Sequence, residues 1–261
     1  MTDDDLHYFR KWFVSYCRAF YLSDEKEQKN IELKELHTLQ VCKNIISIAQ
    51  GESLNSNQVR IAEAVALFHD IGRFRQYAQY KTFRDSLSEN HGLLGFSVLQ
   101  NEKILDRLPS HEQAIIFDAV KLHNTFSIAD ITDVETIRFL KLIRDADKLD
   151  IWRVFIEYYE TPENQRPEAV GLGLPDVSYY SKDVLSSLKG RKVVSLMQLK
   201  TLQDFKLLQL SWVFDLNFRT SFILLKERGY VSGISSTLPQ TEEIVAAIYI
   251  VRSYVEERLN G

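Results

Sequence analysis

Cysteine, glycine and proline are scarce in this chain. Its 261 residues include only two cysteines, ten glycines and five prolines. Cys17 and Cys42 are too few for a disulfide framework and lack the CxxC spacing of a thiolate metal site. Such cysteine usage is typical of a reduced cytosolic protein, so we expect a cytoplasmic location. Any metal ligands would then be nitrogen and oxygen atoms.

Long apolar runs and an excess of positive charge are also absent. No run approaches the roughly 18 residues that a membrane span needs, and the acidic start Met-Thr-Asp-Asp-Asp differs from a secretory leader. We therefore expect a soluble protein without a membrane partner. The formal net charge of −4 provides no global positive field, so nucleic acid is not favoured as a partner.

The chain does show helical periodicity over most of its length. Apolar residues make up 45% of the sequence, enough to bury a full core without a structural metal. They recur at helical spacing, and alternating strand-like runs are almost absent, so an all-α fold is predicted. Helices are expected at Asp4–Tyr21, Ile31–Gln50, Ser56–Ile71 with Gly72 as its stop, Asn90–Asn101, Pro109–Asn124, Thr132–Tyr159, Thr201–Arg228 and Thr241–Leu259.

A proline-rich stretch divides the chain into two parts. Thr161–Tyr180 contains three of the five prolines and two glycines, which predicts a long loop. The helices after it, at about 180–261, would bury little surface alone. We therefore expect them to pack on a core at about 30–160 as one domain spanning residues 1–261. Apolar surface left exposed on these last helices would support a homodimer.

Four of the six histidines form an ordered pattern along the chain, and an aspartate in the segment Arg144–Leu149 follows them. The histidines are His37, His69, His91 and His123. Imidazoles and carboxylates from separate segments are the ligands of a catalytic divalent metal. His69 and Asp70 end an apolar helix, where burying both groups is costly unless a cation pairs with them. Taken singly, each histidine also has a structural interpretation, such as a helix cap or a buried hydrogen-bond partner.

The closing aspartate has two candidates. Asp145 and Asp147 point about 160° apart on one predicted helix, because each residue turns the helix by about 100°. Only one of them can therefore face the metal. Arg144 and Asp150 lie within about 60° of Asp147 and are candidates to support it. The spacing alone leaves Asp145 and Asp147 as alternatives.

The order His, His-Asp, Asp resembles the HD superfamily of metal-dependent phosphohydrolases. Residues 69–72 are similar to the family's His-Asp-Ile-Gly signature, and the segment Ala-Asp-Lys-Leu at 146–149 is similar to its final motif. In that motif the aspartate after the alanine is a ligand, so the resemblance selects Asp147. The match covers roughly residues 37–150. It implies an HD-domain helical bundle, with the C-terminal helices packed on it.

The resemblance also implies the metal ligands. A first ion would be bound by His37, His69, Asp70 and Asp147. Relatives with a binuclear centre have two further histidines, which correspond here to His91 and His123. In those relatives the aspartate of the His-Asp pair, here Asp70, bridges both ions. One or two divalent transition metal ions are expected as cofactors, namely Mn, Fe, Co, Ni or Zn, with Mg as an alternative.

The implied activity is hydrolysis of a nucleotide or another small phosphate ester by a metal-activated hydroxide. The enzyme would be a phosphomonoesterase, a phosphodiesterase or a pyrophosphohydrolase. Members that cleave cyclic di-GMP have a His-His-Glu and Gly-Tyr-Pro region where this chain has Lys121–Ser127, which disfavours that substrate. The same architecture serves a diiron oxygenase, inositol oxygenase. That activity and a non-catalytic ligand sensor are the alternatives.

Hydrolysis of a phosphate ester also requires fixed cations. Arg73 follows the signature and is the first candidate for catalysis and for substrate binding, because a guanidinium binds phosphate bidentately. Lys148, beside the closing aspartate, is the other catalytic candidate besides Asp70. Lys81 and Arg84 precede His91 and are candidates to bind substrate. For these two, a solvated charge or a local ion pair is the simpler interpretation.

Further residues are candidates for supporting roles at the site or in the fold. Asp85 and Glu89 are candidates to orient the ligand imidazoles as hydrogen-bond acceptors. Asp215 and Arg219 have the i,i+4 spacing of a helical salt bridge. Four aromatic residues near the loop before His91 are candidates to stack a nucleobase, although core packing is the commoner role of such residues. They are Phe74, Tyr77, Tyr80 and Phe83.

Overall fold

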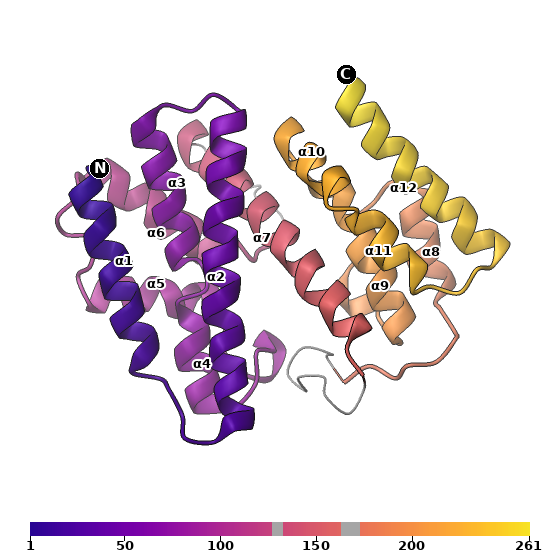
Figure 1. The fold of residues 1–261 in the computed structure, drawn as a ribbon, viewed down its shortest axis with the longest axis horizontal. Helices are drawn as coiled ribbons and strands as arrows, with labels where there is room; N and C mark the ends of the chain where they lie inside the picture. The colour runs from indigo at the N-terminus through magenta and orange to yellow at the C-terminus, as the bar shows by residue number, and fades with distance from the viewer. Residues whose placement is uncertain (127–132, 163–172) are drawn as a thin grey trace. The chain divides into compact units, whose positions relative to one another are not determined.

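A computed structural model describes residues 1–126, 133–162 and 173–261 (Figure 1). These residues form helices and connecting segments without a strand, so the predicted all-α class is confirmed. The chain divides into two compact units, Met1–Asp150 and Ile151–Gly261, and their boundary falls within helix α7 (Val134–Glu160). The packing of the C-terminal helices on the first part as one domain stays a prediction.

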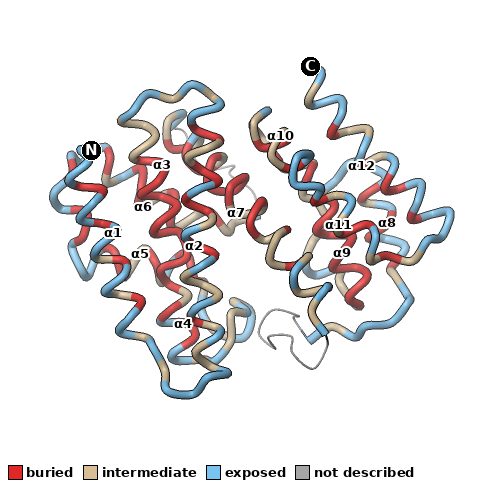
Figure 2. Tube along the Cα trace, in the orientation of Figure 1, coloured by how far each residue is buried: buried red, intermediate tan, exposed pale blue. Residues whose placement is uncertain are grey.

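The first unit is built around α3, whose residues 61–68 are all buried (Figure 2). α3 packs on α1, α2 and α6, and α5 packs on both α4 and α6. Besides the first part of α7, the unit contains α1 (Asp3–Arg18), α2 (Glu25–Gly51), α3 (Ser56–Phe68), α4 (Gly72–Tyr80), a 3₁₀ turn η1 (Asp85–Leu87), α5 (His91–Asn101) and α6 (Ser110–Leu122).

Helix α2 begins six residues before its predicted start at Ile31. The Asp24 side chain accepts hydrogen bonds from the backbone N–H groups of Lys26 and Glu27, which satisfies two donors of the first turn. None of residues 25–30 is buried, so this part of the helix carries no apolar stripe. Apolar periodicity therefore could not reveal it, whereas the capping aspartate could.

Gly72 does not end a helix as predicted. α3 already ends at Phe68, and Gly72 is the first residue of α4, a helix that was not predicted. A Cβ atom at this position would lie 2.2 Å from the His91 carbonyl oxygen and 2.6 Å from the Gly95 nitrogen. Glycine is required here because α4 approaches the backbone of α5 closely.

The second unit contains shorter helices. They are α8 (Lys182–Lys189), η3 (Leu196–Gln198), α9 (Leu202–Ser211), η4 (Trp212–Asp215), α10 (Arg219–Glu227), α11 (Tyr230–Ser236) and α12 (Glu242–Asn260). The single helix predicted at Thr201–Arg228 is therefore wrong: the chain is extended at Leu216 (φ −75°, ψ 139°). Asp215 and Arg219 do not share one helix, so the predicted i,i+4 geometry does not apply. Arg219 instead donates to the Leu259 carbonyl oxygen (3.0 Å).

The predicted loop Thr161–Tyr180 is only partly described. Residues 161–162 and 173–180 contain no helix, as predicted, while residues 163–172 lie outside the described residues. Thr132, the predicted start of the last helix before the loop, and Ser127 also lie outside them. Over the described part of the chain, no helix has both the length and the hydropathy that a bilayer crossing requires.

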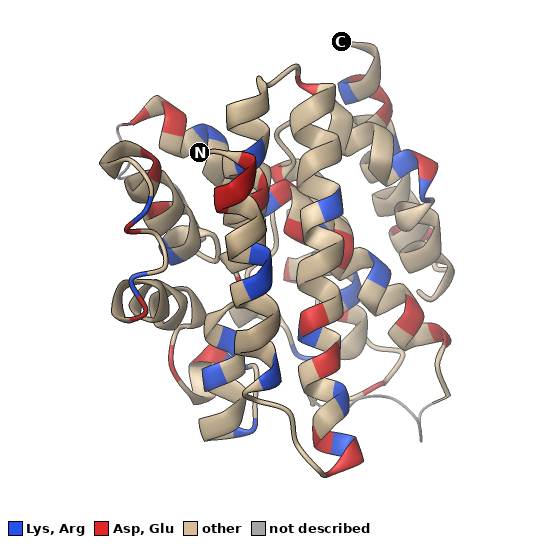
Figure 3. Cartoon of the chain, turned by 60° about the vertical axis from the view of Figure 1, so that its left-hand side comes forward, with Lys and Arg blue, Asp and Glu red and all other residues tan. Residues whose placement is uncertain are grey.

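Acidic and basic residues are mixed along the helices. Figure 3 shows Lys and Arg interspersed with Asp and Glu, in agreement with the small net charge of −4. In that view the described residues show no large area of positive charge. This distribution gives no support to a nucleic-acid surface.

Candidate metal centre

Two of the predicted ligands lie at the junction of α3 and α4. His69 and Asp70 directly follow the buried helix α3, and both are buried. His69 Nδ1 lies 2.7 Å from the Ala66 carbonyl oxygen. Because a carbonyl oxygen only accepts, Nδ1 carries the proton and Nε2 presents its lone pair. This buried Nε2 has no hydrogen-bond partner among the described residues, which fits a metal ligand.

A first cluster forms around His69 Nε2. His37 Nε2, from α2, lies 3.1 Å from Asp147 Oδ1 and 3.6 Å from Asp70 Oδ2. His69 Nε2 is 3.8 Å from each of these two oxygens. Behind the cluster, Asp150 Oδ2 lies 2.7 Å from His37 Nδ1 and fixes the imidazole ring. Helices α2 and α7 and the α3–α4 junction thus contribute to one group of donor atoms.

Of the two candidate aspartates on α7, Asp147 is the one that lies beside His37 and His69. Asp150 follows it by three residues on α7 and contacts the same imidazole from the other side. Asp145 is fully buried on that helix. Arg144, the other candidate to support Asp147, donates to the Thr125 carbonyl oxygen.

A second cluster lies on the other side of Asp70. His91 Nε2 and His123 Nε2 are 3.0 Å apart, and Asp70 Oδ1 lies 3.4 Å and 4.0 Å from them. His123 Nδ1 donates to the Val120 carbonyl oxygen (2.8 Å), so its Nε2 also presents a lone pair. Asp85 Oδ2 lies 2.7 Å from His91 Nδ1. Asp70 therefore presents Oδ2 to the first cluster and Oδ1 to the second.

The two histidines of the second cluster are uncharged near neutral pH. Burial, assisted by the nearby Arg73 guanidinium, lowers the pKa of His91 to about 4. Burial, assisted by the neighbouring His69, lowers the pKa of His123 to about 4. Neutral imidazole is the form that binds a metal ion, so no proton has to leave this pair on binding.

His37 behaves differently. Burial and the nearby Lys34 favour its neutral form, but hydrogen bonds to Asp147 and Asp150 outweigh them and raise the pKa of His37 to about 9. Burial would raise the pKa of Asp70, yet Lys34 and the other cationic groups around it hold that pKa well below its usual value. Asp70 is therefore ionised, whereas His37 would have to release a proton to bind a metal ion.

Arg73 positions both Asp70 and Asp85. Its Nε donates to Asp70 Oδ1 (3.3 Å), and its Nη1 donates to Asp85 Oδ1 (2.9 Å), to Gln76 Oε1 (2.8 Å) and to the Phe83 carbonyl oxygen. Its Nη2 has no acceptor among the described residues. Only this part of the guanidinium is left for the predicted contact with a phosphate.

Lys34 was not predicted from the sequence. Its Nζ donates to Asp70 Oδ2 (2.8 Å) and lies 5.3 Å from the centre of the Phe83 ring. The side chain is only 17% exposed, which is unusual for lysine. Its spacing, three residues before His37 on one helix, could have identified it, since residues at i and i+3 share a face.

Two amides that complete the surroundings of Asp85 were also missed. Gln76, fully buried, donates to Asp85 Oδ1 (2.9 Å) and to Ser88 Oγ (2.8 Å). Asn124 donates to Asp85 Oδ2 (3.1 Å). Gln76 and Asn124 together fix the Asp85 carboxylate. This carboxylate in turn holds the His91 imidazole, which is the role predicted for Asp85. The other predicted acceptor, Glu89, accepts instead from the Tyr80 hydroxyl.

The remaining predicted cations lie in different surroundings. Lys148 Nζ donates to the Arg144 carbonyl oxygen (3.3 Å), one turn back on α7. Lys81 forms an ion pair with Glu27 and lies over the Tyr77 ring. Arg84 is exposed just before η1. Among the described contacts, none joins Lys81 to a predicted metal ligand.

The aromatic candidates to stack a nucleobase differ in how far they are buried and in what they contact. Phe74 is fully buried against Phe13 and Phe20, so it is a core residue. Tyr77 and Phe83 lie with their ring centres 5.0 Å apart. Phe83 is partly exposed and lies under Lys34, the cation that contacts Asp70. Of the four aromatic residues, Phe83 is therefore the best placed to contact a substrate.

Comparison with known protein families gives a match over part of the chain. Residues 36–152 match the HD domain family. This range includes every residue of both clusters, His37, His69, Asp70, His91, His123 and Asp147, together with the supporting Asp85 and Asp150. No curated protein and no solved structure matches the chain.

Proposed function

We propose that this chain, whose residues 36–152 match the HD domain family, is a metal-dependent phosphohydrolase acting on a nucleotide or another small phosphate ester. One observation carries the proposal. Asp70 directs one carboxylate oxygen at His37 and His69 and the other at His91 and His123, so two groups of ligand atoms share it. Such sharing is typical of a binuclear hydrolytic centre.

The donor set fits one or two divalent transition metal ions. Imidazoles with carboxylates suit Mn, Fe, Co, Ni or Zn, and Mg is an alternative. When bound, such ions polarise a phosphoryl oxygen and lower the pKa of a water molecule. We propose His37, His69, Asp70 and Asp147 as ligands of the first ion, and Asp70, His91 and His123 as ligands of the second.

Fixed cations support substrate binding at this centre. Arg73 holds Asp70 in place and keeps Nη2 for a phosphoryl oxygen, and Lys34 brings an ammonium group to the same carboxylate. These groups would stabilise the negative charge that develops on phosphoryl transfer. Lys148 is retained as a catalytic candidate because it adjoins Asp147. Lys81 and Arg84 stay weaker proposals for substrate binding.

Two observations support the choice of a nucleotide substrate and the cellular location. The partly exposed Phe83 ring beside Lys34 provides a face on which a base can stack next to a cation that can bind phosphate. Cys17 and Cys42 are both free and buried, which supports a reducing, cytoplasmic environment. Neither the Phe83 ring nor the two cysteines support nucleic acid as a binding partner.

Phosphate release from a substrate panel tests the proposal. The protein is loaded in turn with Mn, Fe, Co, Ni, Zn or Mg and incubated with nucleotides and sugar phosphates. We expect turnover of at least one compound that EDTA abolishes, that Asp70→Asn removes and that Asp106→Asn, an exposed control in the same unit, retains. No turnover with any metal would overturn the proposal.

Two other outcomes would support the alternative functions. An oxygen-dependent product without phosphate release from the iron-loaded protein would support a diiron oxygenase. Tight metal binding without any turnover would support a ligand sensor.

A further inference from the structure

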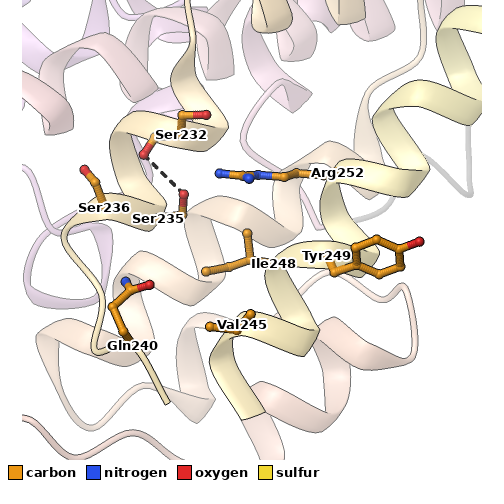
Figure 4. A pocket seen from close by; sticks show the side chains of 8 residues that line it. All are labelled: Ser232, Ser235, Ser236, Gln240, Val245, Ile248, Tyr249 and Arg252. Atoms are coloured by element: carbon orange, nitrogen blue, oxygen red, sulfur yellow. Dashed lines mark hydrogen bonds between the residues drawn. The ribbon is translucent and has the colours of Figure 1, made fainter. Parts of the chain in front are cut away.

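A cavity of about 430 Å³ lies in the second unit, which carries none of the proposed metal ligands. It is formed by α11, by α12 and by the segment between them (Figure 4). This volume is within the range of small-molecule sites. We propose that the cavity binds a small phosphorylated organic molecule, with its phosphate on Arg252 and its carbon skeleton along α12.

Arg252 is the only cation on the cavity wall and has no acceptor among the described residues. The carboxylate one turn along α12, Glu256, is a potential i,i+4 partner but pairs with Lys226 instead (2.8 Å). In Figure 4 the Arg252 side chain extends across the cavity toward Ser232 and Ser235 of α11. An exposed guanidinium with all its donors available is a suitable partner for phosphate oxygens.

The opposite wall supplies hydroxyl groups. Ser232, Ser235 and Ser236 make up three of the seven residues of α11. Ser235 donates to the Ser232 carbonyl oxygen (3.2 Å) and Ser236 donates to the Gly233 carbonyl oxygen (2.8 Å), so their protons are committed. The Ser232 hydroxyl has no partner in the described part of the chain and can donate to a ligand. Arg252 and Ser232 therefore offer donors from two different helices to one anion.

The rest of the wall suits a carbon skeleton. Val245, Ile248, Tyr249 and Arg252 have the i, i+3, i+4, i+7 spacing of one helix face. Val245 is 50% exposed and Tyr249 is 72% exposed, so apolar surface is available beside the cation. Gln240 uses one amide N–H for the Leu238 carbonyl oxygen (2.9 Å) and has a second N–H and its carbonyl for a polar group of the ligand.

A second hollow of about 250 Å³ adjoins the cavity and shares Ser232 and Arg252 with it. The proposed phosphate position thus lies where the two hollows meet. A ligand larger than a sugar phosphate could extend into both. The proposal is independent of the metal centre, because every proposed metal ligand precedes Ile151.

Calorimetric titration of the full chain tests the site. Adenosine monophosphate, adenosine and inorganic phosphate are the probes, and EDTA is present so that no metal ion can hold a phosphate. We expect Arg252→Gln to weaken the monophosphate about tenfold, the scale of one charge-assisted contact, and Ser232→Ala to weaken it about threefold. Arg258→Gln removes the same charge from an exposed position on the same helix and should change the affinity less than about twofold.

Several results would overturn the proposal. They are equal affinity for the monophosphate in the wild type and Arg252→Gln, equal affinity for adenosine and its monophosphate, or no binding of any probe at millimolar concentration. A dimer in analytical ultracentrifugation that Tyr249→Ser dissociates would assign the apolar face to a second copy and would also overturn it. Thermal melting checks the fold of each variant; Arg252 is exposed, so we expect no change in melting temperature.

Discussion

The two clusters that share Asp70 differ in charge. The first combines two histidines with Asp147 and has a further carboxylate, Asp150, behind His37. The second has two histidines and no carboxylate of its own among the described ligand groups, and Asp85 behind His91 is shared with Arg73. A divalent cation is therefore neutralised more fully at the first cluster than at the second.

The protonation of their histidines also distinguishes the two clusters. Without metal, His37 holds a proton up to about pH 9, whereas His91 and His123 are neutral above about pH 4. The first cluster would thus have to release a proton to bind a metal ion, whereas the second would bind one without losing a proton. We expect the first ion to bind more tightly, with an affinity that increases with pH, and the second ion to bind more weakly, with little pH dependence above pH 6.

Removing the shared carboxylate should have the largest effect. Asp70→Ala takes one oxygen ligand from each cluster, so we expect loss of both ions and a decrease in kcat/KM of at least about a thousandfold, or roughly 4 kcal/mol. Metal content is measured by mass spectrometry after dialysis, with Asp106→Ala as the control. Helical circular dichroism should persist, because α3 and its neighbours keep their apolar contacts. Collapse of the fold in both Asp70→Ala and Asp70→Asn would instead make Asp70 a structural residue.

Removing one histidine from each cluster should separate the two sites. His123→Gln leaves all four groups of the first cluster in place, so we expect it to retain one tightly bound ion and lose the other. His69→Gln takes a ligand from the first cluster and should release the tighter ion. Metal titration followed by calorimetry distinguishes the two variants. Identical metal content and affinity in both would contradict the division into two clusters.

Stability of the metal-free protein should depend on pH in opposite directions for the two clusters. The pKa of His37 is raised to about 9, so its contribution is present below pH 6.5 and is lost as the pH rises toward 9. The pKa values of His91 and His123 are lowered to about 4, so their contribution is present above pH 6.5 and is lost as the pH falls toward 4. Each of the three histidines should contribute on the order of 3 kcal/mol to the unfolding free energy, so the decrease at low pH, to which two histidines contribute, should be the larger.

Urea unfolding in EDTA between pH 4 and pH 9 measures these changes, and variants assign them. His37→Gln should remove the decrease at high pH, and His123→Gln should reduce the decrease at low pH. The ionised aspartates of the site act at still lower pH, because their pKa values lie below the usual value for aspartate. A stability profile that neither variant changes would show that these histidines do not set it.

The elements of the metal centre could be predicted where local sequence determines them. His69-Asp70 follows an apolar helix, and the Asn90 side chain caps the helix that begins at His91, so helix signals placed both. The helical repeat also predicted that Asp147 and Asp150 share one face of α7, and both contact His37. These features depend on neighbours along the chain.

The features that were missed depend on contacts between distant segments. Gly72 has the sequence appearance of a helix stop, but its role is set by the backbone of α5, which only the folded chain brings near. Lys34 is 36 residues from its acceptor Asp70, and the break at Leu216 interrupts an apolar pattern that continues through it. Periodicity reports which face of a segment is buried and carries no information on which distant group it meets.

The acceptors behind the histidines should have the smallest effects and should rank in a definite order. Asp150 holds His37 and is almost fully buried, whereas the side chain of Asp85 is 31% exposed. Replacing such an acceptor typically costs about 10- to 100-fold in metal affinity. Asp150→Asn should lie near the upper end of this range and Asp85→Asn near the lower end, because water can replace the lost acceptor at the exposed position. The affinity of each ion is measured by competition with a chelator, with Asp106→Asn as control.

The difference in charge between the two clusters also predicts which ion each variant affects. Asp150→Asn should weaken mainly the binding of the first ion, and Asp85→Asn mainly that of the second. If each variant weakened the binding of both ions equally, the two clusters would act as a single site through Asp70.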